Sequence, residues 1–400
     1  MSIPAASISI VGVGESDIGL VPGSSPMSLG VQAAKAALAD AGLDKTDVDG
    51  LFVLNSYLDY HVRYSNAFSE YFGLSSDRLR VVETVGLGSA SSSGHALQLA
   101  AASVASGQCR TALIIAGDNF LTYGGRDMAL KALAMNRNKE FEDPYGPLVA
   151  ATFAVIATRY MEDHGATSEQ LAHVAVSARN YAALNPRAHM HGKPITIEDV
   201  LASPMISTPF HRLDCSLVSD GGCALVLRRT DDIGDPRSRP VNVLASETCY
   251  GTGQGLTHDS FSQLPHLYTL REGARTASGR AFSHAGLSKD DVDVLFTYDP
   301  FTIVPILFLE GFGYCGDGEG ARFVTEGHIG PGGDLPLNTH GGLLSYCHSG
   351  FPGGMFMLTE AVRQLRGEGL GYQVKDPKVA LIQGYGAQMG IFPATLLGRG

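Results

Sequence analysis

The sequence lacks the features that mark nucleic-acid-binding and membrane proteins. Its formal net charge is -11 and it contains no run of lysine or arginine, which argues against nucleic acid or an anionic membrane surface as the main partner. It has no stretch of about 18 uncharged apolar residues, so no membrane span is expected. Residues 1–6 show no basic region followed by a long apolar run, so we expect no signal peptide and a cytoplasmic protein.

Paired cysteines and metal-ligand patterns are lacking too. The six cysteines form no CxxC pair and none lies at zinc-ligand spacing, so we expect reduced core thiols rather than a disulfide framework. His189-Met-His191 has no carboxylate or cysteine in a recognisable pattern beside it, and we predict no metal site. Gly12-Val-Gly14 follows a predicted strand, but the third glycine of a dinucleotide-binding GxGxxG motif is absent.

What the sequence does contain is a long internal repeat. Residues 41–55 read AGLDKTDVDGLFVLN and residues 285–299, which lie 244 positions later, read AGLSKDDVDVLFTYD, with nine of fifteen residues identical. Each copy follows an alanine-rich helical stretch and passes through an Ala-Gly helix end into an apolar strand. The paired segments are β-rich stretches at 7–13 and 241–248, helices at 29–40 and 272–284, and strands at 50–54 and 294–298.

A weaker match extends the repeat toward the end of each half. A helix at 100–107 leads to a strand at 111–116, and a helix at 357–366 leads to a strand at 379–383. Alternation of strand and helix predicts layered α/β halves with right-handed crossovers. The 244-residue spacing indicates a duplication, since solenoids repeat every 20–50 residues or so.

We therefore predict three parts in the chain. The first half covers residues 1–117 and is completed by about 205–235, and the second half covers 236–400. An inserted loop domain at 118–204 separates them and carries helices of its own at 151–164 and 168–183. Such an insertion serves either as a lid facing the substrate or as a dimerisation element, and the sequence does not separate these two interpretations.

Two halves of this kind joined by a long insertion resemble the thiolase superfamily, and the resemblance runs the whole chain. The match is closest to the branch that contains sterol-carrier-linked thiolases and bacterial lipid-transfer-protein thiolases. The motifs that carry it are ALNPR at 183–187, DCSLVSDGG at 214–222, YDPFT at 298–302 and LNTHGGLLSYCH at 337–348.

The resemblance implies a fold, a substrate class and partners. The fold is the thiolase fold, with duplicated βαβαβ halves in a five-layered αβαβα arrangement. The substrate is a coenzyme A thioester, with no bound cofactor. The implied assembly is a homodimer that works with a small OB-fold, zinc-ribbon partner protein.

Both catalytic cysteines of the family are missing from this sequence. The thiolate nucleophile opens a C-x-x-G-x-x-A-L segment at a helix start, where the helix dipole lowers its pKa, and here Ala90-Ser-Ser-Ser-Gly-His-Ala-Leu97 occupies that segment. The second thiol belongs to a C-x-G-x-G pattern, and here Ile382-Gln-Gly-Tyr-Gly386 replaces it. A methyl group cannot attack a thioester. Ser91 is a candidate substitute nucleophile, although serines here more often cap the following helix.

Polar groups remain at two other positions of the family's site. His348 matches the histidine of the family's G-H-P motif, and Tyr298 stands where an asparagine or histidine completes the oxyanion site. A similar tyrosine occurs in the branch's steroid side-chain aldolases, which also lack the nucleophilic cysteine and carry tyrosine in place of His348. Tyr346 is a third candidate catalytic residue. The helix start at Ala90, together with Asn338 and Gly386, is the candidate oxyanion and substrate-binding group.

These residues favour retro-aldol cleavage of a β-hydroxyacyl-CoA, which needs no acyl-enzyme. The reaction needs a base for the β-hydroxyl and donors for the developing enolate oxygen, roles we assign to Tyr298 and His348. One alternative is a Claisen-type thiolase or acyltransferase with a substituted nucleophile, for which Cys347 is another candidate thiol. A second is a non-catalytic subunit that binds acyl-CoA or lipid.

Overall fold

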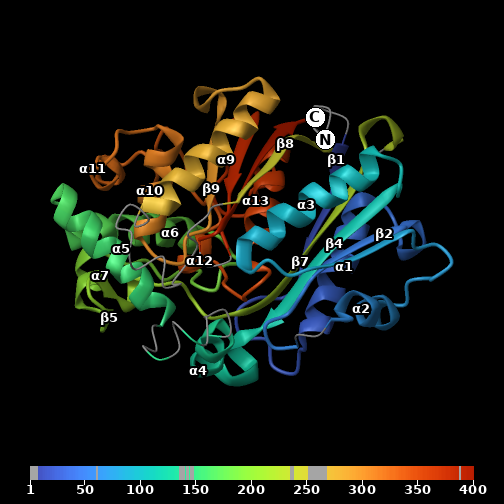
Figure 1. Cartoon of the computed structure of the whole chain (residues 1–400), viewed down its shortest axis with the longest axis horizontal. Coiled ribbons are helices and arrows are strands. Elements are labelled where there is room, and N and C mark those ends of the chain that lie inside the picture. Colours follow the sequence, from blue (N-terminus) through green and yellow to red (C-terminus); the bar gives the residue numbers. More distant parts are fainter. Residues whose placement is uncertain are drawn as a thin grey trace.

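A nine-stranded sheet runs through the part of the chain that the structure describes (Figure 1). This computed structural model describes residues 8–59, 62–134, 140, 144, 148–234, 238–250, 268–386 and 389–400. The strands lie in the order β3-β2-β4-β7-β1-β8-β11-β10-β9. β1 (Ile8–Glu15) and β8 (Val241–Tyr250) meet through only two residue pairs, Ser9 with Asn242 and Ile10 with Val241. The sheet is therefore two half-sheets joined at a short seam.

The two half-sheets repeat one pairing pattern. Outward from the seam, each has two antiparallel pairings followed by parallel ones. In the first half-sheet β1 is followed by β7 (Asp220–Arg229), β4 (Thr111–Asn119), β2 (Gly50–Leu54) and β3 (Val81–Val85). In the second, β8 is followed by β11 (Ile391–Arg399), β10 (Val379–Gln383) and β9 (Val294–Thr297). Leu337, in a parallel bridge to Leu295 of β9, takes the place that β3 has in the first half-sheet.

The repeated sequence produces the same local structure twice. Helices α1 (Pro26–Ala41) and α9 (Thr269–Ala285) both end at a glycine in the left-handed conformation, Gly42 with φ 68° and Gly286 with φ 66°. Side chains strain this backbone conformation, which explains the Ala-Gly step in both copies. Short 3₁₀ turns at Lys45–Asp47 and Lys289–Asp291 then lead into β2 and β9.

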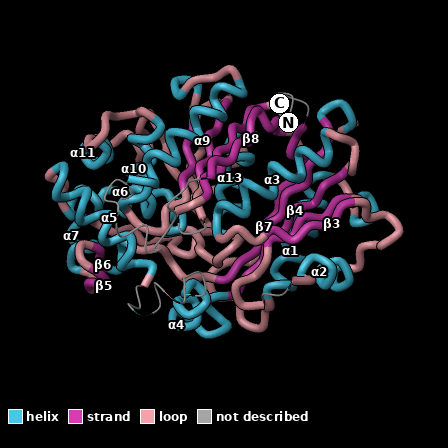
Figure 2. Tube along the Cα trace, in the orientation of Figure 1, coloured by secondary structure: helices cyan, strands magenta, loops and turns pink. Residues whose placement is uncertain are grey.

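Helices cover both faces of the half-sheets and fill the space between them (Figure 2). α3 (Ser89–Ala105) packs against α13 (Gly353–Arg366), and this central pair contacts strands of both half-sheets. α1 and α2 (Tyr64–Phe72) cover the outer face of the first half-sheet, and α9 and α10 (Ile303–Phe312) cover that of the second. The predicted five-layered αβαβα arrangement is confirmed.

Between β4 and β7 the chain forms the insertion. Its elements are α4 (Phe120–Ala134), α5 (Val149–His164), α6 (Ser168–Leu184), α7 (Ile197–Ala202), and the short strands β5 (Met205–Ser207) and β6 (Phe210–His211). α6 contacts α11 (Gly320–Thr325) and α12 (Gly342–Ser345), so the insertion packs against the second half of the chain. The boundaries proposed for the three parts stay a prediction.

The glycines Gly12 and Gly14 serve packing in this fold. A Cβ at Gly12 would lie 2.2 Å from the Ala37 carbonyl oxygen, and one at Gly14 would lie 2.3 Å from the Ala33 carbonyl oxygen. Only glycine therefore lets α1 pack this closely on β1. Among the described residues, no helix has both the length and the apolar character needed to cross a membrane.

The predicted elements of the repeat are present, and one of them extends further than predicted. The helix expected at 100–107 is the end of α3, which begins at Ser89. The serines and small residues at 89–94 gave no periodic apolar signal, and the helix start is instead held by its packing against α13.

Candidate active site

The hydroxyl of Tyr298 and the imidazole of His348 meet in the interior of the second half. Tyr298 directly follows β9, and His348 lies between α12 and α13. Their Oη and Nε2 atoms are 3.0 Å apart, and the two rings are nearly perpendicular at 83°. Both side chains are buried. The structure thus joins the two residues to which the sequence assigned the chemistry.

Ser216 contacts the other ring nitrogen of His348. Its Oγ lies 2.9 Å from Nδ1, so the imidazole is held between two hydroxyl groups. Backbone hydrogen bonds from Ser216 to the Pro300 carbonyl and from Ser219 to the His348 carbonyl tie this segment to both partners, at 2.8 and 3.0 Å. The loop at 214–220 therefore fixes Tyr298 and His348 relative to each other.

Burial determines the protonation state of His348. Removal from water lowers the pKa of the imidazole to about 4, although a hydrogen bond with the Leu217 backbone opposes this shift. The ring is consequently neutral near pH 7, with one nitrogen free to accept a proton and the other carrying one. A neutral imidazole in contact with a phenol can take the phenol's proton.

Two adjacent glycines let α13 approach the site. A Cβ at Gly353 would lie 3.2 Å from His348 Cδ2 and 3.3 Å from Tyr298 Cε2. A Cβ at Gly354 would lie 2.6 Å from the Cα of Ala90 and from the Oγ of Ser93. The first turn of α13 therefore separates the Tyr298–His348 pair from the start of α3.

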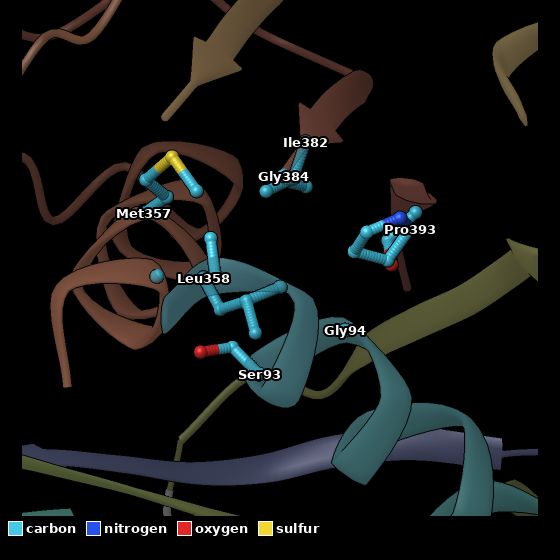
Figure 3. A pocket seen from close by; sticks show the side chains of 10 residues that line it. Ser93, Gly94, Met357, Leu358, Ile382, Gly384 and Pro393 are labelled. Atoms are coloured by element: carbon cyan, nitrogen blue, oxygen red, sulfur yellow. The ribbon is translucent and has the colours of Figure 1, made fainter. Parts of the chain in front are cut away.

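The two positions that lack the family's thiols line one small pocket. Ala90 and Ile382 both border it, together with Ser93, and Figure 3 shows Ile382 and Ser93 converging on it from β10 and α3. A Cβ at Gly384 would lie 3.0 Å from the Cβ of Ala90, so the turn after β10 closes over the helix start. Apolar groups occupy the place where thiolate chemistry is expected.

Ser91 and the remaining oxyanion candidates are engaged in local hydrogen bonds. The buried Ser91 hydroxyl donates to the carbonyls of Leu87 and Gly88, at 2.9 and 2.6 Å. The Gly386 N–H donates to the Ile391 carbonyl at 3.0 Å. The Asn338 amide pairs with both backbone groups of Thr297, at 2.9 Å each, and so holds the strand end that carries Tyr298.

Tyr346 and Cys347 point away from the Tyr298–His348 pair. The buried Tyr346 hydroxyl donates to Glu15 Oε2 at 2.6 Å, and burial, with the Glu15 charge, keeps its pKa well above the ordinary value. Cys347 Sγ lies 3.5 Å from the Asp220 carbonyl oxygen, and burial raises the pKa of this thiol. Neither arrangement favours a nucleophile or a base. The catalytic role of Tyr346 therefore stays a prediction without geometric support.

Sequence reasoning did not single out Ser216 or Gly353 as site residues. Ser216 belongs to the DCSLVSDGG motif, so the signal was present, but nothing in one sequence shows that this segment reaches His348. Gly353 lies in Gly350-Phe-Pro-Gly-Gly354. This pattern predicts a turn, and it does not by itself predict that the backbone lies close to Tyr298 and His348.

Comparison with known proteins identifies the family. Residues 253–399 match the family model described as "Thiolase C-terminal domain-like". The chain is 35% identical over 374 residues to a 17-hydroxy-3-oxo-4-pregnene-20-carboxyl-CoA lyase of Mycobacterium tuberculosis, in an alignment that covers 90% of this chain and 91% of the relative. The chain belongs to the thiolase superfamily. Its relatives put this thiolase-fold enzyme in the sterol-carrier and lipid-transfer-protein branch, as the motifs predicted.

Other similar proteins carry the names of two reaction types, aldolase and acetyltransferase. The solved structure of an Ltp2–ChsH2(DUF35) aldolase superposes with a TM-score of 0.84 at 30% identity, covering 99% of this chain and 98% of the other. An acetyl-CoA acetyltransferase of Methanothermobacter thermautotrophicus is also 30% identical, covering 98% of this chain and 99% of the relative. Overall similarity therefore identifies a thiolase-superfamily enzyme, and its site residues must distinguish lyase from transferase.

Proposed function

We propose that this enzyme cleaves a β-hydroxyacyl-CoA by a retro-aldol reaction, without an acyl-enzyme. Two observations carry the proposal: the Ser216–His348–Tyr298 chain of contacts, and alanine in place of the nucleophile at the start of α3. The 35% identical relative is named a lyase, and the aligned structure is named an aldolase. Both names agree with the chemistry that the residues favour.

The reaction uses Tyr298 and His348 as a proton relay. The β-hydroxyl of the substrate gives its proton to Tyr298 Oη while Tyr298 gives its own proton to His348 Nε2. The Cα–Cβ bond breaks, Cβ becomes a ketone or aldehyde carbon, and the electron pair forms the enolate of the thioester. The relay then returns the proton to Cα, which releases an acyl-CoA. Ser216 accepts a hydrogen bond from the Nδ1 proton and keeps Nε2 open as the acceptor.

The proposed substrate is a coenzyme A thioester with an apolar acyl group, and no bound cofactor takes part. The first compound to test is 17-hydroxy-3-oxo-4-pregnene-20-carboxyl-CoA, from the name of the Mycobacterium relative. Aromatic and branched aliphatic β-hydroxyacyl-CoA thioesters complete the panel.

The decisive measurement is product formation with and without free coenzyme A. Retro-aldol cleavage releases a carbonyl compound and an acyl-CoA at a rate independent of added coenzyme A, whereas thiolysis consumes it. Tyr298→Phe and His348→Ala should each lower kcat/KM by about 100-fold or more. A covalent acyl adduct on Ser91 or Cys347, detected by mass spectrometry, would contradict the proposal.

We also propose an assembly for the enzyme, a homodimer with a small partner subunit. The aligned aldolase structure carries a name that pairs Ltp2 with ChsH2(DUF35), which supports an OB-fold partner here. β3 forms one end of the nine-stranded sheet, and four of its five residues are at least partly exposed, which suits pairing with a second copy.

A further inference from the structure

Retro-aldol cleavage places negative charge on the thioester oxygen as the enolate forms, so the site needs a hydrogen-bond donor beside Tyr298. Of the donors expected from the sequence, the Asn338 amide and the Gly386 N–H are already used, and the N–H groups at the start of α3 are separated from Tyr298 by the first turn of α13. The Asn338 amide N–H donates to the Thr297 carbonyl at 2.9 Å, and the Gly386 N–H donates to the Ile391 carbonyl at 3.0 Å. The Ser91 hydroxyl donates to the Gly88 carbonyl at 2.6 Å.

His348 is not a suitable donor in the same step. Its Nε2 contacts the Tyr298 hydroxyl at 3.0 Å, and its Nδ1 contacts Ser216 Oγ at 2.9 Å. In the relay, Nε2 must begin as an acceptor, so the neutral ring has no proton directed at the substrate. Another donor is required.

Tyr385 is a second phenol directly beside Tyr298. Its ring packs edge-on against the Tyr298 ring, with centroids 5.3 Å apart and planes at 80°. Phe153 of α5 and Phe308 of α10 hold the Tyr385 ring on other sides, at centroid distances of 5.8 and 6.1 Å. The position of the ring is thus fixed by packing on three aromatic neighbours.

The hydroxyl of Tyr385 has no hydrogen-bond partner within the described part of the chain, although the residue is only 6% exposed. A phenol that makes no hydrogen bond within the protein has its O–H donor available for a ligand. Burial, followed by the nearby Tyr298 and Asp299 groups, keeps the pKa of Tyr385 well above the ordinary value. The phenol therefore keeps its proton and acts as a donor.

We propose that the Tyr385 hydroxyl is a catalytic residue that donates a hydrogen bond to the enolate oxygen of the acyl-CoA thioester. This inference rests on the proposed retro-aldol function. Tyr298 handles the proton of the β-hydroxyl, and Tyr385 stabilises the charge that forms when the carbon–carbon bond breaks. Sequence reasoning assigned no role to Tyr385. It lies in Ile382-Gln-Gly-Tyr-Gly386, the segment in which the family carries its second thiol.

Tyr385→Phe tests this role because it removes one oxygen and leaves the packed ring in place. We expect kcat for β-hydroxyacyl-CoA cleavage to fall by about 100-fold, the usual effect of losing one oxyanion donor, with KM nearly unchanged. The melting temperature should not fall, since the hydroxyl makes no hydrogen bond that folding would lose. Tyr314→Phe is the matched control. Tyr314 follows α10 and its hydroxyl donates to the Lys289 carbonyl at 3.0 Å, away from the site, so the rate of this variant should stay at the wild-type value.

A second readout isolates enolate formation from bond cleavage. In D₂O the enzyme should exchange the α-protons of butyryl-CoA through the same enolate, and Tyr385→Phe should slow this exchange by a similar factor. If the wild type cleaves β-hydroxyacyl-CoA and Tyr385→Phe cleaves it at the same rate, this inference alone is overturned. The enolate oxygen would then be assigned to the N–H groups at the start of α3 near Ala90. A slower variant with a lower melting temperature would identify a packing role and overturn it too. Failure of the wild type to cleave any β-hydroxyacyl-CoA would instead reject the proposed function.

Discussion

At the scale of single residues, three distant segments supply the groups that meet in the site. Ser216 comes from the loop before β7, Tyr298 from the end of β9, and His348 from the segment before α13. Backbone hydrogen bonds hold these segments together. The 2.8 Å bond from the Ser216 N–H to the Pro300 carbonyl, for example, ties the loop to the segment that carries Tyr298. The loop at 214–220 is therefore part of the site and not only a connection between the insertion and the sheet.

Ser216→Ala should slow the reaction without weakening substrate binding. Loss of the partner at Nδ1 leaves the tautomer and orientation of His348 less well fixed, so kcat should fall about tenfold while KM stays near the wild-type value. Ser216→Thr retains the hydroxyl and should recover most of the rate. Steady-state kinetics of the three proteins measures this. An unaffected Ser216→Ala enzyme would mean that the Ser216 hydroxyl does not position His348.

At the scale of elements, a buried ionic cluster connects β1 to α13. Glu15 at the end of β1 forms an ion pair with Arg363 at 2.7 Å, lies 3.4 Å from Arg187, and accepts hydrogen bonds from Tyr346 and Thr359. Burial by itself would raise the pKa of Glu15, but the two arginines and the two hydroxyls outweigh it and lower the pKa to about 2. Tyr346 lies two residues before His348, so this cluster also anchors the segment that carries the imidazole.

Glu15→Gln should destabilise the protein by about 3 kcal/mol at pH 7, because it removes the buried carboxylate that faces two partly buried arginines. The pKa of Glu15 is lowered in the folded state, so its contribution is fully present above pH 4.5 and is lost as the pH falls toward 2. Urea unfolding at several pH values measures both effects, and the variant should lose less stability on acidification. Asp231→Asn, which breaks the exposed pair with Arg229, is the control and should leave the free energy of unfolding nearly unchanged. Equal effects of the two substitutions would contradict the role of the cluster.

At the scale of the whole molecule, the duplication produced two similar frameworks, and the described site lies mostly in one. The repeat aligns Leu54 with Tyr298 and Asn55 with Asp299, so the first half has an apolar residue where the second has the phenol that we propose as catalytic. The first half contributes the start of α3, which packs beside α13 in the central layer. The proposed site therefore draws on both halves, although the residues proposed for proton transfer, Tyr298 and His348, belong to the second.

The free edge of β3 gives a direct test of the proposed homodimer. The Asn55 N–H of the neighbouring segment donates to the Val85 carbonyl at 3.0 Å, so Val85 faces β2 and the alternation of a parallel strand directs the N–H of Thr84 outward, away from β2. Thr84→Pro should convert a dimer to a monomer in light scattering while the melting temperature of the monomer stays close to that of Thr84→Ala, which should remain dimeric. A dimeric Thr84→Pro protein would place the interface elsewhere.

The sequence alone determined the layered α/β architecture and the family. The repeat at 41–55 and 285–299 was sufficient because alternating strands, helices and Ala-Gly helix ends are local patterns, set by side-chain periodicity and backbone conformation. It also determined that Ala90 and Ile382 cannot act as thiols, since this follows from residue identity within a family motif.

Only the tertiary structure decided how the site is assembled. Ser216 and His348 are 132 positions apart, and their contact depends on how loops cross between half-sheets. The same crossing turns Tyr346 toward Glu15, and among the described residues it leaves Tyr385 beside Tyr298 without a hydrogen-bond partner. No local pattern encodes these directions, because a side chain's hydrogen-bond partners depend on packing between segments that the chain brings together only when it folds.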